Sequence, residues 1–231
     1  MADSLRRRMM IGQRGSRLPA GYIELEYIEC DGRQYAKLAT GSSNGLEFNL
    51  GWDIYAKYLA SSGSPYGWYY SSWNRKSATG ANVGSGSIVI YYGMVYGRAN
   101  PYDSWIPNVT INDASSSSWH TIKQTVDGVI FDDGALTAYS LNGGNYSYRQ
   151  TVYGDYLGVC GRYNETSGVG GMDSLFSGYL AELKVGQGTG DVFYHLIPAM
   201  NAILEVGFYD LINDNFITSE SGTAFIAGPV K

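Results

Sequence analysis

The sequence predicts an all-β protein built from short antiparallel strands and tight turns, and three observations carry this prediction. Glycine (31 of 231 residues) and tyrosine (21) are both frequent, while charged residues make up only 16%. Such a composition is typical of chains with many short strands and few helices. The stretch 119–136, WHTIKQTVDGVIFDDGAL, places Asp-Gly pairs between β-branched runs. Several other segments alternate apolar and polar residues with a period of two.

The stretch 119–136 predicts consecutive hairpins that form the spine of a sheet. Its Asp-Gly pairs at 127–128 and 133–134 supply the positive φ angles that tight turns need. Its Thr, Val, Ile and Phe residues suit a pleated surface. We therefore expect three strands here, at 119–126, 129–132 and 135–140.

Apolar runs bounded by Gly, Pro, Asn or Ser residues predict the remaining strands. In the run LFSGYLAELKV, we expect Ala181, Leu183 and Val185 on the buried face and Glu182 and Lys184 on the solvated face. The last thirty residues predict a hairpin-rich unit that closes on Phe225. The further strands are expected at 23–30, 33–38, 46–59, 87–96, 156–160, 175–185 and 193–201, with irregular structure at 60–86 and 98–108.

The cysteine and histidine content limits the possible metal and redox chemistry. Cys30 and Cys160 each lie in an apolar run, which favours two buried thiols over a bridge. His120 and His195 are the only histidines, so the sequence offers no Cys/His cluster for zinc. No run approaches 18 apolar residues, which predicts no membrane span. The N-terminus lacks the apolar core of a signal peptide, so export by a standard signal is not expected.

The charge distribution divides the chain into a basic arm, residues 1–17, and one domain, residues 18–231. The net charge of −5 argues against nucleic acid as a partner. The arm nevertheless carries five arginines against Asp3, which leaves 11 basic and 20 acidic residues for the domain. A basic arm on an acidic body predicts docking on an acidic partner. The arm is either a short helix or a disordered tail. Its expected anchoring residues are Leu5, Arg6, Arg7, Arg8, Met9, Met10 and Ile11.

The order of several motifs resembles laminin G-like domains of the concanavalin A-like jelly-roll superfamily. These motifs are W-H-x-I, a D-G turn, D-D-G, Y-L-G-V and F-x-G-Y-L-A-E-L-K-V. The opening LPAGYIELEYIECDGRQY and the closing YHLIPAMN…VGFYDLINDNFITSESGTAFIAGP resemble a subset common in gut Bacteroidales and their phages. That subset reads Ser-Thr-Gly-Thr where this chain has CDGR at 30–33. The resemblance covers roughly 18–229, and LRRRMM resembles the N-termini of some predicted virion proteins.

This resemblance implies a two-sheet antiparallel jelly-roll sandwich with its first and last segments side by side. Glucanases of the superfamily place carboxylates on alternate residues of one strand, and no such E-x-D-x-E run occurs here. Glu24 and Glu26 lie on an expected edge strand, and Glu182 is expected to pair with Lys184 in solvent. Neither histidine lies near a nucleophile-elbow motif. We therefore expect a protein that is not an enzyme.

Two kinds of ligand are compatible with the sequence. Aromatic side chains in loop-like sequence can stack on sugars or contact a protein partner. The expected glycan-binding or partner-binding residues are Trp68, Tyr69, Tyr70, Trp73, Tyr102 and Trp105. Calcium at the rim, which many laminin G-like domains bind, is the alternative ligand, and no other cofactor is expected. Its candidate oxygen donors are Asp103, Asn108, Asp155, Asn164 and Asp173.

These expectations lead to a structural protein of a phage virion, such as a head or tail fibre or a decoration protein. The arm would anchor the chain to other virion proteins, and the jelly roll would be displayed on the particle surface for adhesion to a surface or glycan. We also expect a homo-oligomer. Two alternatives stay open, namely a bacterial surface carbohydrate-binding module and a glycoside hydrolase with an unrecognised site.

Overall fold

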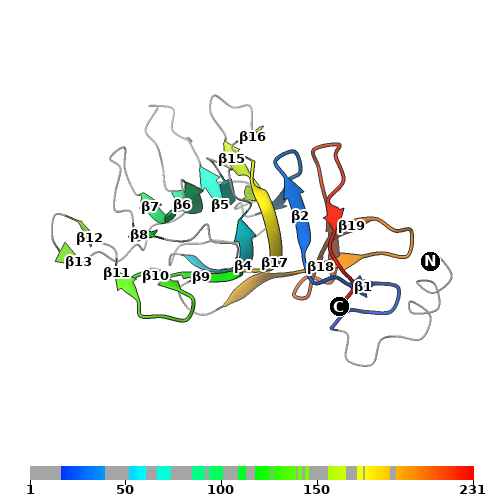
Figure 1. The fold of residues 1–231 in the computed structure, drawn as a ribbon, viewed down its shortest axis with the longest axis horizontal. Helices are drawn as coiled ribbons and strands as arrows, with labels where there is room; N and C mark the ends of the chain where they lie inside the picture. Colours follow the sequence, from blue (N-terminus) through cyan, green and yellow to red (C-terminus); the bar gives the residue numbers. More distant parts are fainter. Residues whose placement is uncertain are drawn as a thin grey trace.

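A computed structural model describes most of the domain. It covers the backbone of residues 17–39, 52–60, 67–73, 85–91, 94–100, 109–112, 118–125, 127–138, 140–141, 144–145, 156–164, 171–173, 175–187 and 191–231. Side chains are described for residues 17–39, 55–59, 118–125, 127–138, 156, 158–161, 175–186 and 191–231. All regular structure in these segments is β, and the strands form two packed sheets (Figure 1). The predicted all-β sandwich is therefore confirmed.

The larger sheet has 11 strands within the described segments. Its main path is β11-β10-β9-β4-β17-β18-β19-β20, with β1, β2 and β21 beside it. β17 is its central strand, because one edge pairs with β4 while the other pairs first with β2 and then with β18. The bounds are β1 Ile23–Glu24, β2 Ile28–Asp31, β4 Trp52–Ala60, β9 His120–Gln124, β10 Gly128–Phe131, β11 Thr137–Ala138, β17 Ser177–Gln187, β18 Val192–Met200, β19 Val206–Asp210, β20 Asn215–Thr218 and β21 Ile226–Ala227.

The smaller sheet has eight described strands along the path β16-β15-β5-β6-β7-β8, with β14 and β3 beside it. Among the pairings described in either sheet, only β15 with β5 is parallel. A separate short hairpin joins β12 (Ser140–Leu141) to β13 (Gly144–Asn145). The bounds of the smaller sheet are β3 Ala36–Ala39, β5 Gly67–Trp73, β6 Ser85–Tyr91, β7 Met94–Asn100, β8 Val109–Asn112, β14 Tyr156–Val159, β15 Arg162–Asn164 and β16 Gly171–Asp173.

The hydrophobic core lies between the two sheets and is cross-linked. Large side chains such as Tyr58, Phe176 and Phe208 are fully buried in it. Cys30 of β2 forms a disulfide with Cys160, which follows β14 of the other sheet. The expectation that both cysteines are buried is confirmed, but the expectation of two free thiols is wrong. The two residues lie opposite each other across the core, with a Cα–Cα distance of 6.7 Å that permits a bond.

The central hairpins occur where the sequence predicts them, as β9, β10 and β11. The glycines of the two Asp-Gly pairs, however, do not supply the positive φ angles that were expected of them. The positive φ angles at the second turn belong to Asp132 (47°) and Asp133 (56°). Asp residues adopt this region more readily than most side chains do. Gly128 is needed for a different reason, because a Cβ there would collide with the backbone of Thr137 on β11.

Three predicted strands differ from the structure. The strand expected at 87–96 is the β6–β7 hairpin, in which Tyr91 pairs with Met94, and Gly93 in the run IVIYYGMVY is the sequence signal for that reversal. The strand expected at 23–30 is divided into β1 and β2, because these pieces pair with β18 and β17 respectively. A bulge in β17 between Leu180 and Glu182 leaves Ala181 half-buried, so the predicted burial of Ala181 is wrong.

The first and last described segments lie side by side, as the resemblance implied. Leu25 and Val230 form an antiparallel bridge, and the Glu26 amide donates to the Pro229 carbonyl at 2.8 Å. Residues 226–231 thus run along the divided β1–β2 segment, and the C-terminus lies beside β1 (Figure 1). No helix suited to crossing a membrane occurs in the described part of the chain.

Candidate functional site

The outer face of the larger sheet, which points away from the core, carries ordered rows of outward-pointing side chains. Ala56 and Tyr58 of β4 are buried in the core, so the alternate residues of this strand point outward. Lys57 lies opposite Thr121 of β9 on one side and Glu182 of β17 on the other. The neighbouring rows have the same arrangement; they contain Glu29, Tyr179 and Leu59, and Lys184, Tyr55 and Lys123.

Three aromatic rings on this face form a contiguous surface, which we call the aromatic platform: Tyr27, Trp119 and Tyr179. The ring centres of Tyr27 and Tyr179 are 5.0 Å apart, and those of Tyr27 and Trp119 are 5.6 Å apart. Lys57 Nζ lies 6.0 Å from the centre of the Trp119 ring. Trp119 remains 38% exposed, so the platform offers an indole surface with a cation beside it.

Tyr27 joins the platform because the chain is divided between β1 and β2. Strict alternation would have placed Tyr27 on the same face as Ile23 and Leu25, which are buried. The Tyr27 carbonyl instead accepts a hydrogen bond from the Gly228 amide at 3.1 Å. A Cβ at Gly228 would lie 2.6 Å from Cδ2 of the Tyr27 ring, so glycine allows the ring to rest against the C-terminal segment. Sequence analysis missed this platform because its three rings come from distant segments.

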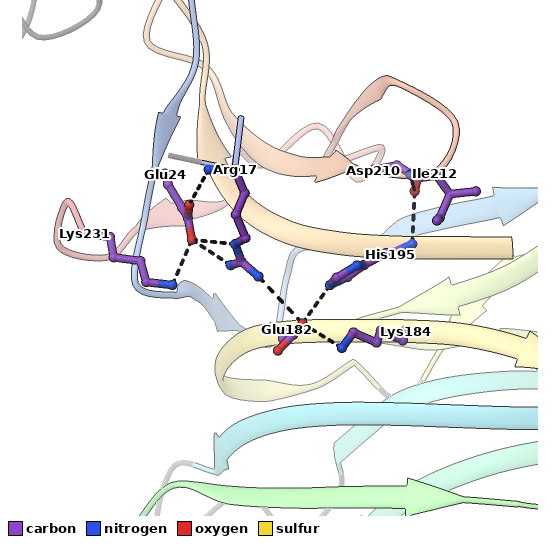
Figure 2. Close-up of polar contacts among 8 residues, drawn as sticks. All are labelled: Arg17, Glu24, Glu182, Lys184, His195, Asp210, Ile212 and Lys231. Carbon is purple, nitrogen blue, oxygen red and sulfur yellow. Dashed lines mark hydrogen bonds and ion pairs between the residues drawn. The ribbon is translucent and has the colours of Figure 1, made fainter. Parts of the chain in front are cut away.

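A second feature of the outer face is a group of charged side chains around Glu24 and Glu182, which we call the charged cluster (Figure 2). Its members are Arg17, Glu24, Glu182, Lys184, His195 and Lys231.

Glu24 is the most buried carboxylate of the charged cluster, with a side chain only 5% exposed. Its Oε1 accepts hydrogen bonds from Arg17 Nη2 at 2.6 Å and from Lys231 Nζ at 2.8 Å. Burial alone would raise the pKa of Glu24, but the hydrogen bonds and charges of these two cations outweigh it, and the pKa is lowered. Glu24 therefore fastens the base of the arm to the last residue of the chain.

Glu182 pairs with Lys184, as the sequence predicted, but its side chain is only 19% exposed and has two further partners, so the expected solvated setting is wrong. Its Oε1 lies 2.7 Å from His195 Nε2, 3.2 Å from Lys184 Nζ and 3.8 Å from Arg17 Nη1. Burial would raise the pKa of Glu182, and the hydrogen bonds from His195 and Lys184 more than offset it, so the pKa is lowered. Arg17 thus joins the two carboxylates into one network (Figure 2).

The other polar groups near the two histidines hold turns in place. The buried Asp210 accepts hydrogen bonds from the backbone amides of His195 and Ile212, both at 3.0 Å, which fixes the β19–β20 turn. Asp132 lies 2.7 Å from His120 Nδ1 and accepts from the Thr121 amide at 2.8 Å, which secures the β9–β10 hairpin. These contacts account for the histidines as structural residues.

The aromatic residues expected in loops are only partly described. Trp68, Tyr69, Tyr70 and Trp73 lie on β5, so their expected placement in an irregular loop is wrong. A register shift between Trp68 and Tyr70 interrupts the pairing of β5 with β6. The strand was not predicted because the sequence around it is rich in Ser and Gly, which are typical of loops. Tyr102, Trp105 and the expected anchoring residues at 5–11 lie outside the described residues.

Two of the five candidate calcium donors lie in the part of the chain whose backbone is described. Asn164 and Asp173 lie on the paired strands β15 and β16, so their expected placement in a loop is wrong. Asp103, Asn108 and Asp155 lie outside the described residues. Within the described segments, no group of three or more His, Cys, Asp or Glu side chains is placed to hold a metal ion.

Comparisons with known proteins bear on the fold. No family model and no curated protein sequence matches the chain. Among solved structures it is similar to domains LG4-5 of the mouse laminin α1 chain, with 18% identity and a TM-score of 0.50. The match covers 74% of this chain and 43% of the laminin chain, so this chain spans less than half of that structure. This similarity confirms the laminin G-like jelly-roll fold.

A second solved structure is more distant. Scytalido-glutamic peptidase, in complex with a peptide-based transition-state analogue, aligns with a TM-score of 0.31 and 12% identity over 90% of this chain and 100% of the peptidase. A similarity at that level carries no argument about fold or activity.

Proposed function

We propose that this protein is a non-enzymatic adhesion protein of a phage particle, anchored through its N-terminal arm and binding glycan on the outer face of its larger sheet. The exposed aromatic platform is the observation that carries this proposal. Its rings offer apolar surface, and Lys57 and Glu29 beside them offer a hydrogen-bond donor and acceptor for hydroxyl groups. Such a mixture suits a sugar ring better than it suits a purely apolar or strongly charged ligand.

The arrangement of the domain supports a protein that is anchored at one end and exposed at the other. Arg17 is clamped between Glu24 and Glu182, which fixes the point from which the arm leaves the domain. This point lies beside β1 and the C-terminus, whereas β6, β7, β8 and the β12–β13 hairpin lie at the far end of the molecule (Figure 1). An arm bound at one end would leave the other end free.

The disulfide supports a location outside the reducing cytosol. Bonds such as Cys30–Cys160 persist in oxidising surroundings, including virion and cell surfaces. Both the phage particle and the alternative, a bacterial surface carbohydrate-binding module, satisfy this condition. The arm distinguishes them, because only the particle protein needs it for assembly.

A glycan array with matched variants tests the binding proposal. Trp119→Ala should abolish the glycan signal of the intact protein without changing its circular dichroism spectrum, because it removes the exposed ring. Tyr156→Ala is the matched control, since Tyr156 is 37% exposed but lies on β14 in the other sheet. An array without signal, or equal loss in both variants, would disprove binding at the platform. Trp68→Ala and Trp73→Ala test β5 in the same way.

Deletion of residues 1–16 tests the anchoring proposal while keeping the Arg17 clamp. The shortened protein should fold normally, and purified phage particles should lack it when their composition is measured by mass spectrometry. Incorporation of the full-length chain should weaken with added salt, because arginine charges steer the contact. Normal incorporation of the shortened protein would refute anchoring by the arm and favour the bacterial module.

A further inference from the structure

The aromatic platform is compact, and one ring supplies most of its accessible surface. The planes of Tyr27 and Tyr179 are inclined by 69°, and those of Tyr27 and Trp119 by 44°. Rings that lie within 6 Å of each other at such angles pack edge against face, so each covers part of its neighbour. Tyr27 and Tyr179 are half-buried, whereas Trp119 is 38% exposed. Trp119 therefore offers the ring surface on which a ligand can stack.

The platform has no continuation along the sheet in the described residues. Among the described side chains of β4, β9 and β17, the next outward-pointing ring is Tyr55. Tyr55 precedes Leu59, which pairs with Tyr179 of the platform, by four residues of the same strand. At about 3.4 Å per residue, the row of Tyr55 is therefore roughly 13 Å from the platform.

The ring of Tyr55 is also less available than that of Trp119. Lys184 Nζ lies 5.0 Å from the centre of the Tyr55 ring, and Glu182 Oε1 holds that ammonium group at 3.2 Å. One face of Tyr55 is thus already covered. Extended polymers are held when successive units stack on successive open rings, as in proteins that bind single-stranded nucleic acids. The outer face lacks such a series in its described part.

Lys57 supplies a polar group at the edge of the platform. Its Nζ lies 6.0 Å from the centre of the Trp119 ring, and its side chain is exposed. The carboxylate opposite it, Glu182, is already bound by three other basic groups. Among the residues whose side chains are described, Lys57 forms no ion pair. Its ammonium group is therefore available to donate hydrogen bonds to hydroxyl groups.

We infer that the aromatic platform binds a single pyranose ring, which stacks on Trp119 while Lys57 donates to its hydroxyl groups. The inference rests on the proposed glycan binding and specifies its ligand class. Chain ends and single-residue branches of surface glycans present such a ring most openly, so they are the ligands that the platform fits. Contact with one ring gives weak binding per copy, and several copies on a particle strengthen attachment to a surface with many ends.

NMR titration of the purified full chain with sugars of increasing length tests the inference. The probes are methyl galactoside, methyl glucoside, methyl mannoside and methyl N-acetylglucosaminide, each compared with its own linear di-, tri- and tetrasaccharide. In every series that binds, we expect the Kd of the monosaccharide and of the tetrasaccharide to agree within about fivefold. Stacking of a second ring would lower the Kd by about tenfold or more.

Variants of the outer face separate one ring from an extended track. Lys57→Met should raise the Kd of the methyl glycoside about tenfold, because a hydrogen bond from a charged donor is lost. Lys57→Arg should retain most of the binding, since guanidinium also donates. Lys123→Met is the matched control, because Lys123 is an exposed lysine of the same face in the row of Tyr55. Tyr55→Ser should leave the Kd of the tetrasaccharide unchanged. Melting temperatures show whether each variant is folded.

Four results would overturn the inference. Affinity could rise tenfold or more with chain length, or the glycan array could give signal although no methyl glycoside binds. Tyr55→Ser could weaken the tetrasaccharide selectively, which would reveal a second stacking position. Lys57→Met could bind as wild type does. Each of these results leaves glycan binding itself in place, so the proposed function would stand. Absence of binding both to every probe and on the array would instead refute the glycan-binding proposal, and this inference with it.

Discussion

Glu24 shows how one side chain can connect distant parts of this chain. It is nearly buried, yet it stays ionised because Arg17 and Lys231 both donate to the same oxygen. Burying a carboxylate is costly unless such partners are present. The cations themselves remain 39% and 56% exposed, so they can return to water if Glu24 is removed.

Glu24→Gln should destabilise the domain by about 1–2 kcal/mol at pH 7, because two charge-assisted hydrogen bonds are lost. The pKa of Glu24 is lowered in the folded state, so its contribution is present above the unfolded value of about 4.3 and is lost as pH falls through the folded value. Urea unfolding of wild type and variant should therefore differ at pH 7 and converge in acid. A constant difference down to pH 3 would contradict this account.

The role of Glu24 could not be predicted from the sequence, which placed it on an exposed edge strand. β1 is in fact flanked on both sides: Glu24 pairs with Ala199 of β18, and its carbonyl accepts from the Lys231 amide at 3.1 Å. The alternation of apolar and polar residues predicts which face of a strand a side chain lies on. It does not predict contacts with residues far away in the sequence, such as Lys231. The predicted pairing of Glu182 with Lys184 is confirmed, but its contact with His195 was missed for the same reason, since His195 comes from β18.

At the scale of elements, β17 illustrates how close packing can require glycine. Gly178 lies between Cys30 of β2 and Ala60 of β4, with a φ of +152°. A Cβ at this position would collide with the Phe176 ring and lie 2.5 Å from the Leu59 carbonyl oxygen. The backbone of β4 cannot move without disturbing the sheet, so this strand requires glycine here.

Gly178→Ala should destabilise the domain by about 2–4 kcal/mol through overpacking and backbone strain. Its urea midpoint should fall while the slope of the transition stays constant. Gly222→Ala is the matched control: Gly222 has a φ of +80° and open space around it, so alanine there adds backbone strain without a collision. Equal stability losses in both variants would mean that backbone conformation, and not the collision, determines the effect.

At this scale the sequence predicted most of the strands and missed their interruptions. The Asp-Gly pairs between β9, β10 and β11 predicted these three strands correctly, because a turn signal depends only on neighbouring residues. The bulge at Ala181 has no comparable signal, since an apolar residue fits either face of a strand next to Leu180. The β6–β7 hairpin was predicted as one strand because Gly93 alone, between two apolar runs, is a weak turn signal.

On the scale of the whole molecule, the Cys30–Cys160 bond ties the two sheets together. It joins residues 130 positions apart, so it restricts a large part of the unfolded chain. Long enclosed loops give the greatest loss of chain entropy in the unfolded state. The bond therefore stabilises the sandwich chiefly by making unfolding less favourable.

Replacing both cysteines by alanine should lower the free energy of unfolding by about 2–5 kcal/mol. Titration of the denatured wild-type protein should detect no thiol before reduction and two afterwards. In the presence of reductant, wild type and variant should approach the same stability, apart from the smaller volume of alanine. Two reactive thiols in the denatured, unreduced protein would show that the bond does not form.

The resemblance found in the motifs predicted the jelly roll and the pairing of the first and last segments, because both follow from strand order. It could not predict the disulfide, because the pairing of two cysteines depends on their separation in space. The aromatic platform escaped prediction for the same reason, as Tyr27, Trp119 and Tyr179 meet only after the larger sheet has formed.

The pairing of Leu25 with Val230 also affects how quickly the native state is reached. Contacts between residues so far apart in sequence form late, because closing the intervening loop costs entropy before any contact compensates for it. Refolding of the disulfide-bonded protein should therefore take on the order of milliseconds to seconds, as it does for other sandwiches dominated by nonlocal strand pairs. During that interval β1 and β2 lack their partner strand, and exposed strand edges favour aggregation in concentrated solution.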